Sequence, residues 1–257
     1  MLDCSKLPKK PFLSNKTEFA YEAHMIAREN AFNKIFGLSY PDNKIIIPND
    51  GNLLLNWPGG GVFQYEPKES RNGWHYVTHG LSQPDNPKLK TEKDEDACSG
   101  FGVEFVISTP DLNNWAPNVL LNLVKYLLFQ KTSKIIYPFH RLPCNGPIVT
   151  DTDTQITHLL AVPSPEYENE IQLPAGFCEL VHMVGITENE FNYAVNWGSG
   201  TGGSMILFET LQRLNVGNLT DPTRACSTDM DNFKSIWDEL QIKLEAMWKE
   251  NGWDGEK

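Results

Sequence analysis

The sequence predicts a domain of the α+β class, with a mixed and largely antiparallel sheet packed against helices. Strand-like and helix-like segments follow one another without a regular strand–helix–strand repeat, which argues against a doubly wound parallel sheet. The composition is that of an ordinary globular protein, since the 257 residues are 40% hydrophobic and 21% charged. A chain of this length buries enough surface to fold without a disulfide or a metal.

The first half of the chain predicts one helix followed by several strands. Residues 15–18 have the form of a capping box, and Gly37 and Pro41 end the helical pattern that follows. Apolar alternation and β-branched residues predict strands over the following segments: 44–48, 52–57, 74–81 and 101–108. Residues 82–98 hold prolines and mixed charge, and we expect them to form an exposed loop.

The second half alternates between helices and buried strands. An apolar helix opens at residues 115–117, and a second capping box at 187–190 starts another helix. The remaining elements are two strands and two helices, over residues 156–162, 177–186, 205–214 and 231–251. The last of these helices is amphipathic and is expected to pack on the domain or on a partner. We therefore divide the chain into an N-terminal arm, a central domain and a C-terminal extension: 1–17, 18–215 and 216–257.

Cysteine usage and hydropathy point to a protein of the cytoplasm. The cysteines are odd in number and never form a Cys-x-x-Cys pair, so reduced thiols are expected in place of a disulfide framework or a zinc site. The N-terminus lacks the basic and apolar regions of a signal peptide. No apolar stretch approaches the length of a membrane span, so no membrane association is expected.

The net charge of −11 restricts the choice of partners. An acidic surface repels phosphate backbones, and no stripe of lysine and arginine counteracts this, so nucleic acid is not an expected partner. Charge complementarity instead favours association with a basic protein.

Some residues match cofactor or metal motifs by letters, but the elements predicted around them do not suit such a site. Residues 198–203 fit G-x-G-x-x-G by letters, but a helix precedes them where a dinucleotide site needs a strand. His75 and His79 share one face of a predicted strand at a separation of roughly 13 Å, too far to hold one ion. Glu179 and His182 lie three residues apart on a strand and face opposite sides. We expect no cofactor and no metal.

No catalytic signature is present either. The sequence contains no Gly-x-Ser-x-Gly elbow, and no cysteine–histidine pair has a local nucleophile pattern. Four histidines are interpreted as hydrogen-bonded core residues: His24, His140, His158 and His182. We therefore expect no catalytic residue.

Two segments carry a family resemblance. Residues 74–82 read WHYVTHGLS and residues 99–104 read SGFGVE, which resembles the most specific signature of the Suppressor of Fused domain. Further segments agree in the same order: 115–130, 156–160, 180–190 and the helix from 205. The resemblance covers residues 18–215 and is closest in type to the single-domain members found in bacteria.

The resemblance implies the fold of the family's N-terminal domain and a role in holding other proteins. In animals the family regulates Hedgehog signalling by sequestering transcription factors, through a short peptide that adds as a strand between this domain and a second, C-terminal one. Residues 216–257 stand in place of that second domain, so the Hedgehog function is not expected to transfer. Bacterial single-domain relatives are thought to be immunity proteins, which implies a partner such as a basic toxin domain or an extended peptide segment.

The sequence thus predicts a non-catalytic protein that sequesters or inhibits a protein partner. By resemblance, Tyr126 matches a groove tyrosine, and Phe139 falls where the animal proteins have an acidic contact. The candidate partner-binding residues are Trp74, Tyr76, His79, Glu92, Asp94, Glu95, Asp96, Tyr126, Phe139 and His140. Two alternatives stay open: a hydrolase with an unrecognised histidine or carboxylate site, and a structural module that oligomerises through the C-terminal helix.

Overall fold

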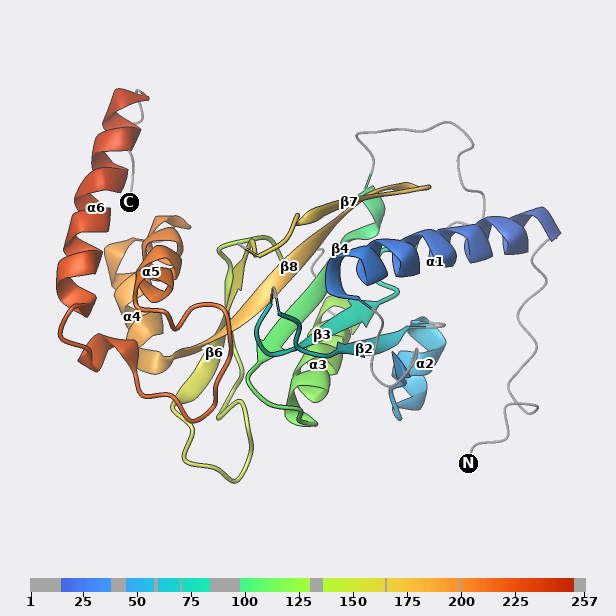
Figure 1. The fold of residues 1–257 in the computed structure, drawn as a ribbon, viewed down its shortest axis with the longest axis horizontal. Helices are drawn as coiled ribbons and strands as arrows, with labels where there is room; N and C mark the ends of the chain where they lie inside the picture. Colours follow the sequence, from blue (N-terminus) through green and yellow to red (C-terminus); the bar gives the residue numbers. More distant parts are fainter. Residues whose placement is uncertain are drawn as a thin grey trace.

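One twisted sheet organises the chain (Figure 1). The computed structural model describes residues 15–37, 45–57, 60–69, 71–83, 98–129, 136–164, 166–198 and 200–251, with side chains from residue 22 onward. Within these residues the sheet has eight strands in the order β1-β2-β3-β4-β8-β6-β5, and β7 also pairs with β8. The strands are Ile45–Ile46 (β1), Gly61–Tyr65 (β2), Trp74–His79 (β3), Cys98–Thr109 (β4), Arg141–Pro143 (β5), Ile156–Val162 (β6), Glu170–Leu173 (β7) and Gly176–Thr187 (β8).

The sheet is mixed, as predicted, because β4 and β8 run parallel while the other pairs are antiparallel. The helices are Asn15–Phe36 (α1), Gly51–Asn56 (α2), Trp115–Phe129 (α3), Glu188–Trp197 (α4), Gly202–Arg213 (α5) and Phe233–Glu250 (α6), and a short 3-10 turn spans Ser227–Asp229 (η2). The predicted α+β class, with its C-terminal helix, is confirmed.

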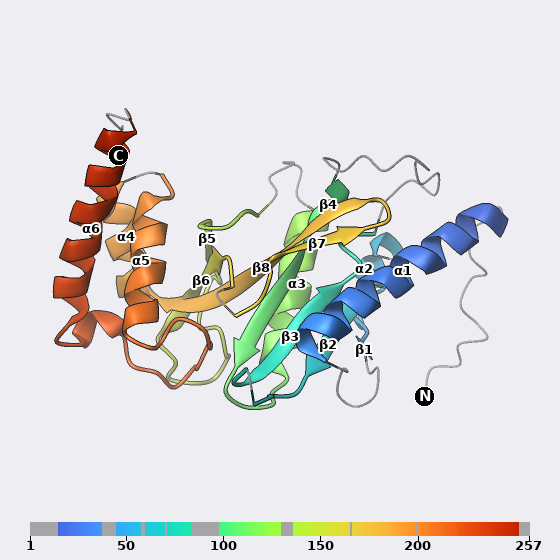
Figure 2. The ribbon, with the colours of Figure 1, turned by 45° about the horizontal axis from the view of Figure 1, so that its top comes forward.

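Helices cover both faces of the sheet, and the alternation of side chains along each strand decides which residues meet them. Phe105 and Ile107 of β4 belong to the core under α3, whereas Val106 between them belongs to the core under α1. Figure 2 shows α1 and α3 on opposite sides of β2, β3 and β4.

The helices α4, α5 and α6 form a bundle at the other end of the face that carries α1 (Figure 1). Val184 and Ile186 of β8 point into this bundle, and α6 adds buried Phe233, Trp237 and Leu240 to the same core. The amphipathic helix predicted at the C-terminus therefore packs on its own domain.

Residues 52–57 correct one prediction. The leucine run there was expected to form a strand, but it lies in the helix α2. The carboxylate of Asp50 accepts hydrogen bonds from the backbone N–H groups of Asn52 and Leu53, at 3.0 and 3.3 Å. Such a cap satisfies groups that a helix start otherwise leaves without partners, so the local cap decides the structure.

Candidate functional site

The strand β5 lies at one edge of the sheet, with β6 on its inner side. Leu142 pairs with Leu159 of β6, and Pro143 pairs with His158. A proline cannot donate to a sheet ladder, so it is found at edges of this kind. No further strand pairs with the outer side of β5 within the described residues, so β5 is an edge strand of this part of the sheet.

A groove of about 460 Å³ follows this edge, between α3 and β5. One wall comes from α3, with Leu123, Asn122 and the side chain of Tyr126, which is 46% exposed. Leu142 and Cys144 line the opposite wall. The groove is mostly apolar and offers a few polar groups, a composition typical of sites that bind polypeptide or small ligands.

Charge is scarce in this groove. Among the described residues that line it, Arg141 is the only charged one. Its guanidinium donates a hydrogen bond to the carbonyl oxygen of Gly200, at 3.3 Å, in the connection between α4 and α5. Burial raises the pKa of the Cys144 thiol to about 11, so this cysteine stays protonated and is not an activated nucleophile.

A tight turn leads into β5. The N–H of His140 donates to the carbonyl of Tyr137, and Phe139 has a φ of 70°, as at the third position of a type II turn. Glycine is the usual residue there, and a phenylalanine costs about 1–3 kcal/mol of strain. The Phe139 ring lies 6.4 Å from the ring of Phe208 in α5. Strain of this kind beside an open edge is a common feature of functional sites.

Three of the four histidines expected in the core are buried, and one is not. His140 is exposed and not in the core, with its ring 5.8 Å from that of Tyr137. His24, His158 and His182 are buried, but both ring nitrogens of His182 have no hydrogen-bond partner among the described atoms. The expectation of a hydrogen-bonded core histidine is therefore wrong for His140, which is exposed. His182 is buried as expected, but it is not hydrogen-bonded to the described atoms.

The other predicted contact residues lie apart from the β5 groove. Tyr76 is fully buried, with its hydroxyl hydrogen-bonded to the backbone of Asn113, and His79 is buried under α1. As interior side chains they form no contact surface, which corrects the expectation for these two residues. Trp74 is half-buried against the core under α3. The predicted acidic contacts lie outside the described residues: Glu92, Asp94, Glu95 and Asp96.

The segment that carries the family signature forms a buried hydrogen-bond network. The carboxylate of Glu104 has no exposed surface and accepts from the hydroxyls of Thr78 and Ser82, both at 2.7 Å. It also accepts from the backbone N–H groups of Gly80 and Ser82, both at 2.9 Å. Glu104 thus fixes the end of β3 and the chain that follows it. The sequence identified these motifs but not this role.

The helix α1 joins the same network. Arg28 donates to the Ser82 hydroxyl at 3.2 Å, and a ring nitrogen of His24 lies 3.1 Å from the Ser82 carbonyl oxygen. The Ser99 hydroxyl lies 3.2 Å from His24 but donates to that carbonyl, at 2.7 Å. All of these side chains are buried. This serine–histidine contact therefore does not present a nucleophile to solvent.

Buried histidines make stability depend on pH. Burial, together with the positive charge of Arg28, lowers the pKa of His24 to about 4, and burial lowers that of His182 to about 4. The folded protein therefore binds these protons less readily than the unfolded chain, whose histidines titrate near 6.5. Their contribution is fully present above pH 6.5 and is lost as the pH falls towards 4.

We predict that the free energy of unfolding drops on acidification. From about pH 7 to about pH 5 the loss is on the order of 2 kcal/mol for each such histidine. Urea unfolding at the two pH values measures it, and His182→Gln should remove one histidine's share. An unchanged pH dependence in that variant would contradict the assignment.

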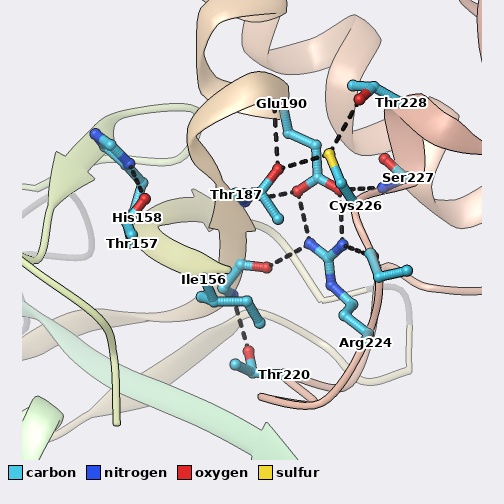
Figure 3. A network of polar contacts seen from close by, with 12 residues as sticks. Ile156, Thr157, His158, Thr187, Glu190, Thr220, Arg224, Cys226, Ser227 and Thr228 are labelled. Carbon is cyan, nitrogen blue, oxygen red and sulfur yellow. Dashed lines mark hydrogen bonds and ion pairs between the residues drawn. The ribbon is translucent and has the colours of Figure 1, made fainter. Parts of the chain in front are cut away.

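A second network fixes the start of the C-terminal extension (Figure 3). Glu190, fully buried in α4, receives two hydrogen bonds of 2.6 Å from the guanidinium of Arg224. The backbone N–H groups of Thr187 and Ser227 donate to the same carboxylate, both at 2.8 Å. Burial alone raises the pKa of Glu190, but the hydrogen bonds and charge of Arg224 outweigh it and hold the pKa below its usual value.

The extension is also hydrogen-bonded to the sheet. Thr220 accepts from the N–H of Gly185 at 2.8 Å and donates its own N–H to the carbonyl of Ser108 at 2.7 Å. A side chain on Gly185 would collide with Thr220, so a glycine is needed at this contact. The predicted division after residue 215 therefore does not coincide with a break in the packing.

The described residues form neither a metal-binding cluster nor a membrane-spanning helix. Their histidines, cysteines and carboxylates nowhere gather in threes close enough to hold a metal ion. Likewise, none of the helices in this part of the chain combines the length and apolar character needed to span a bilayer.

A mixed sheet with helices on both faces and an open edge at β5 defines an α+β domain with a groove beside an edge strand. A family model described as Suppressor of fused protein (SUFU) matches residues 57–225. The chain belongs to the Suppressor of fused family, and the predicted resemblance is confirmed. The search of curated proteins gave no match.

Solved structures support the same fold. A structure described as the Sufu–Fu complex has a TM-score of 0.61 at 19% identity, over 86% of this chain and 97% of that chain. Drosophila Suppressor of Fused gives 0.62 at 18% identity, over 87% of this chain and 55% of its own length. A SUFU homologue from Neisseria gonorrhoeae FA 1090 gives 0.58 at 19% identity, over 79% and 96%.

Proposed function

We propose that this protein is a non-catalytic binding protein that holds an extended segment of a protein partner along the outer side of β5. The observation that carries the proposal is the apolar groove directly beside an open sheet edge. Backbone hydrogen bonds to such an edge provide affinity, and pockets for alternate side chains provide specificity. Tyr126 and Asn122 on α3 would contact those side chains.

The family supports this role. One similar structure is a Sufu–Fu complex, so that relative was solved with a partner named Fu. For this chain we propose a partner of a different kind, namely a basic toxin domain that the protein neutralises as an immunity protein. The charge of −11 supports a basic partner, because it would speed association with one.

Other residues predicted to contact the partner would contribute beside the groove or at long range. Phe139 and His140 lie in the turn before β5 and would flank the bound segment. The acidic residues Glu92, Asp94 and Glu95, with Asp96, would act through long-range attraction, which mainly affects the association rate. We also propose that the protein works in the cytoplasm. Cys98, Cys144, Cys178 and Cys226 are free thiols, which suits a reducing compartment.

A matched pair of substitutions on α3 tests the groove. Asn122 and Asn118 are both exposed and one helical turn apart, but only Asn122 lines the groove. Asn122→Arg should lower the affinity for the native partner by at least about tenfold, because a long cation fills an apolar site. Asn118→Arg should leave affinity unchanged. Arginine suits a helix better than asparagine, so neither variant should fail to fold.

The measurement is a binding titration of each variant with the partner captured by the wild-type protein. Equal affinity for the wild type and Asn122→Arg would place the partner elsewhere and refute the proposed groove. Tyr126→Ala offers an independent check, since it removes an exposed aromatic side chain from the same wall.

A further inference from the structure

A second hollow, of about 680 Å³, lies between α4 and α6. Two aromatic contacts join these helices: the rings of Tyr193 and Trp237 are 5.3 Å apart, and those of Trp197 and Trp248 are 5.2 Å apart. Tyr193, Trp197 and Trp237 also line the hollow, so it is a recess with an aromatic floor.

Three asparagines form the α4 side of this recess. Asn189, Asn192 and Asn196 recur at intervals of three and four residues, so they lie on one stripe of the helix. All three are exposed, and none of their side chains makes a hydrogen bond within the part of the chain that the structure describes. Each carboxamide therefore has its donors and its acceptor available to a ligand.

The asparagines are also unfavourable for the helix itself. Asparagine has a lower helix propensity than alanine because its side chain competes for backbone hydrogen bonds in other conformations. In α4 that cost is not offset by a side-chain hydrogen bond of these asparagines within the described residues. A stripe of residues that weakens its own helix is better explained by recognition of a ligand than by stability.

The lining is uncharged. The remaining described contributors are Thr228 and Gln241, so none of the described side chains that line the recess carries a formal charge, although the chain has a net charge of −11. None of these lining side chains offers a counter-charge to a charged ligand, and leaving a charge unpaired in a recess is costly. The ligand that fits is neutral and both donates and accepts hydrogen bonds.

We propose that this recess binds an uncharged saccharide. Sugar hydroxyls donate and accept as carboxamides do, and the apolar C–H face of a sugar ring can lie on the half-exposed ring of Tyr193. A polypeptide that adds as a strand is the weaker alternative, because strand addition needs a sheet edge and both walls here are helices. The proposal is independent of the β5 groove.

The test uses the full chain and a panel of neutral probes: maltotriose, cellobiose, lactose and N,N′-diacetylchitobiose. Saturation-transfer NMR detects binding, and tryptophan fluorescence titration gives the affinity. We expect at least one neutral sugar to bind. The double variant Asn192→Ala/Asn196→Ala should lose at least about tenfold in affinity for that sugar, since two carboxamide contacts disappear.

Two controls separate recognition from folding. Asn118→Ala removes the same side chain from an exposed position of α3, away from the recess, and should leave sugar binding unchanged. The double variant should unfold at the same or a higher denaturant concentration than the wild type, because alanine favours the helix. The proposal is overturned if no neutral sugar binds, if binding survives in the double variant, or if Asn118→Ala loses it equally.

Discussion

Glu104→Ala is expected to lower the free energy of unfolding by at least about 4 kcal/mol, or to prevent folding altogether. The substitution leaves four buried donors without their acceptor: the hydroxyls of Thr78 and Ser82 and the N–H groups of Gly80 and Ser82. Each unsatisfied buried donor costs about 1–3 kcal/mol.

Glu104→Gln serves as the graded control. Three of the four hydrogen bonds end on one carboxylate oxygen, and the glutamine carbonyl can keep these. The amide group then faces the Thr78 hydroxyl, which already accepts from the N–H of Phe105 and would lose its own acceptor. We expect a loss of about 1–2 kcal/mol in urea unfolding. Equal effects of the two variants would contradict the hydrogen-bond account.

The second large effect concerns Arg224. Arg224→Ala is expected to lower the free energy of unfolding by about 3–5 kcal/mol, because it leaves the charge of Glu190 buried without its partner. Glu190 is fully buried, and the Arg224 side chain is only 7% exposed. The loss should shrink at low pH. Glu190 has a lowered pKa in the folded protein, so its contribution disappears as the pH falls through that value.

Arg213→Ala is the matched control. Arg213 also pairs with carboxylates, those of Glu209 and Glu239, but these pairs are exposed. Removing an exposed pair typically costs no more than about 1 kcal/mol. Chemical unfolding of both variants measures the contrast. If the two substitutions cost the same, burial of the Glu190–Arg224 pair is not what stabilises the attachment of the extension.

Local signals explain what the sequence predicted well. The capping box at Thr187 forms as expected, with Glu190 at its third position, and the helix α1 ends before Gly37. Both features depend on a few neighbouring residues. The helix α2 was missed because the strand-like leucine run outweighed a single capping residue, Asp50, in the sequence pattern.

Only one wall of the candidate groove was predicted, because its two walls, α3 and β5, are formed by separate segments of the chain. Tyr126 was identified, but β5 is three residues long and too short to give a strand signal. Its neighbour in space, Leu142, was therefore not placed beside α3. Tyr76 and His79 were assigned to a contact surface because no local pattern reveals that α1 and α3 cover β3 from both sides.

The role of Glu104 was hidden for the same reason. Its motif was recognised as part of the family signature, yet its hydrogen-bond donors lie more than twenty residues earlier, at the end of β3. Only the antiparallel pairing of β3 and β4 brings them together. From the sequence alone, such a buried carboxylate cannot be distinguished from an exposed polar residue of a strand.

Hydrogen–deuterium exchange of the protein alone and with its captured partner tests whether a partner segment binds along the outer side of β5. Binding along the sheet edge should slow exchange in β5 and the segment that follows it, and leave the exposed face of α6 unchanged. Protection confined to α6, or to any surface remote from the α3–β5 groove, would rule out binding along β5.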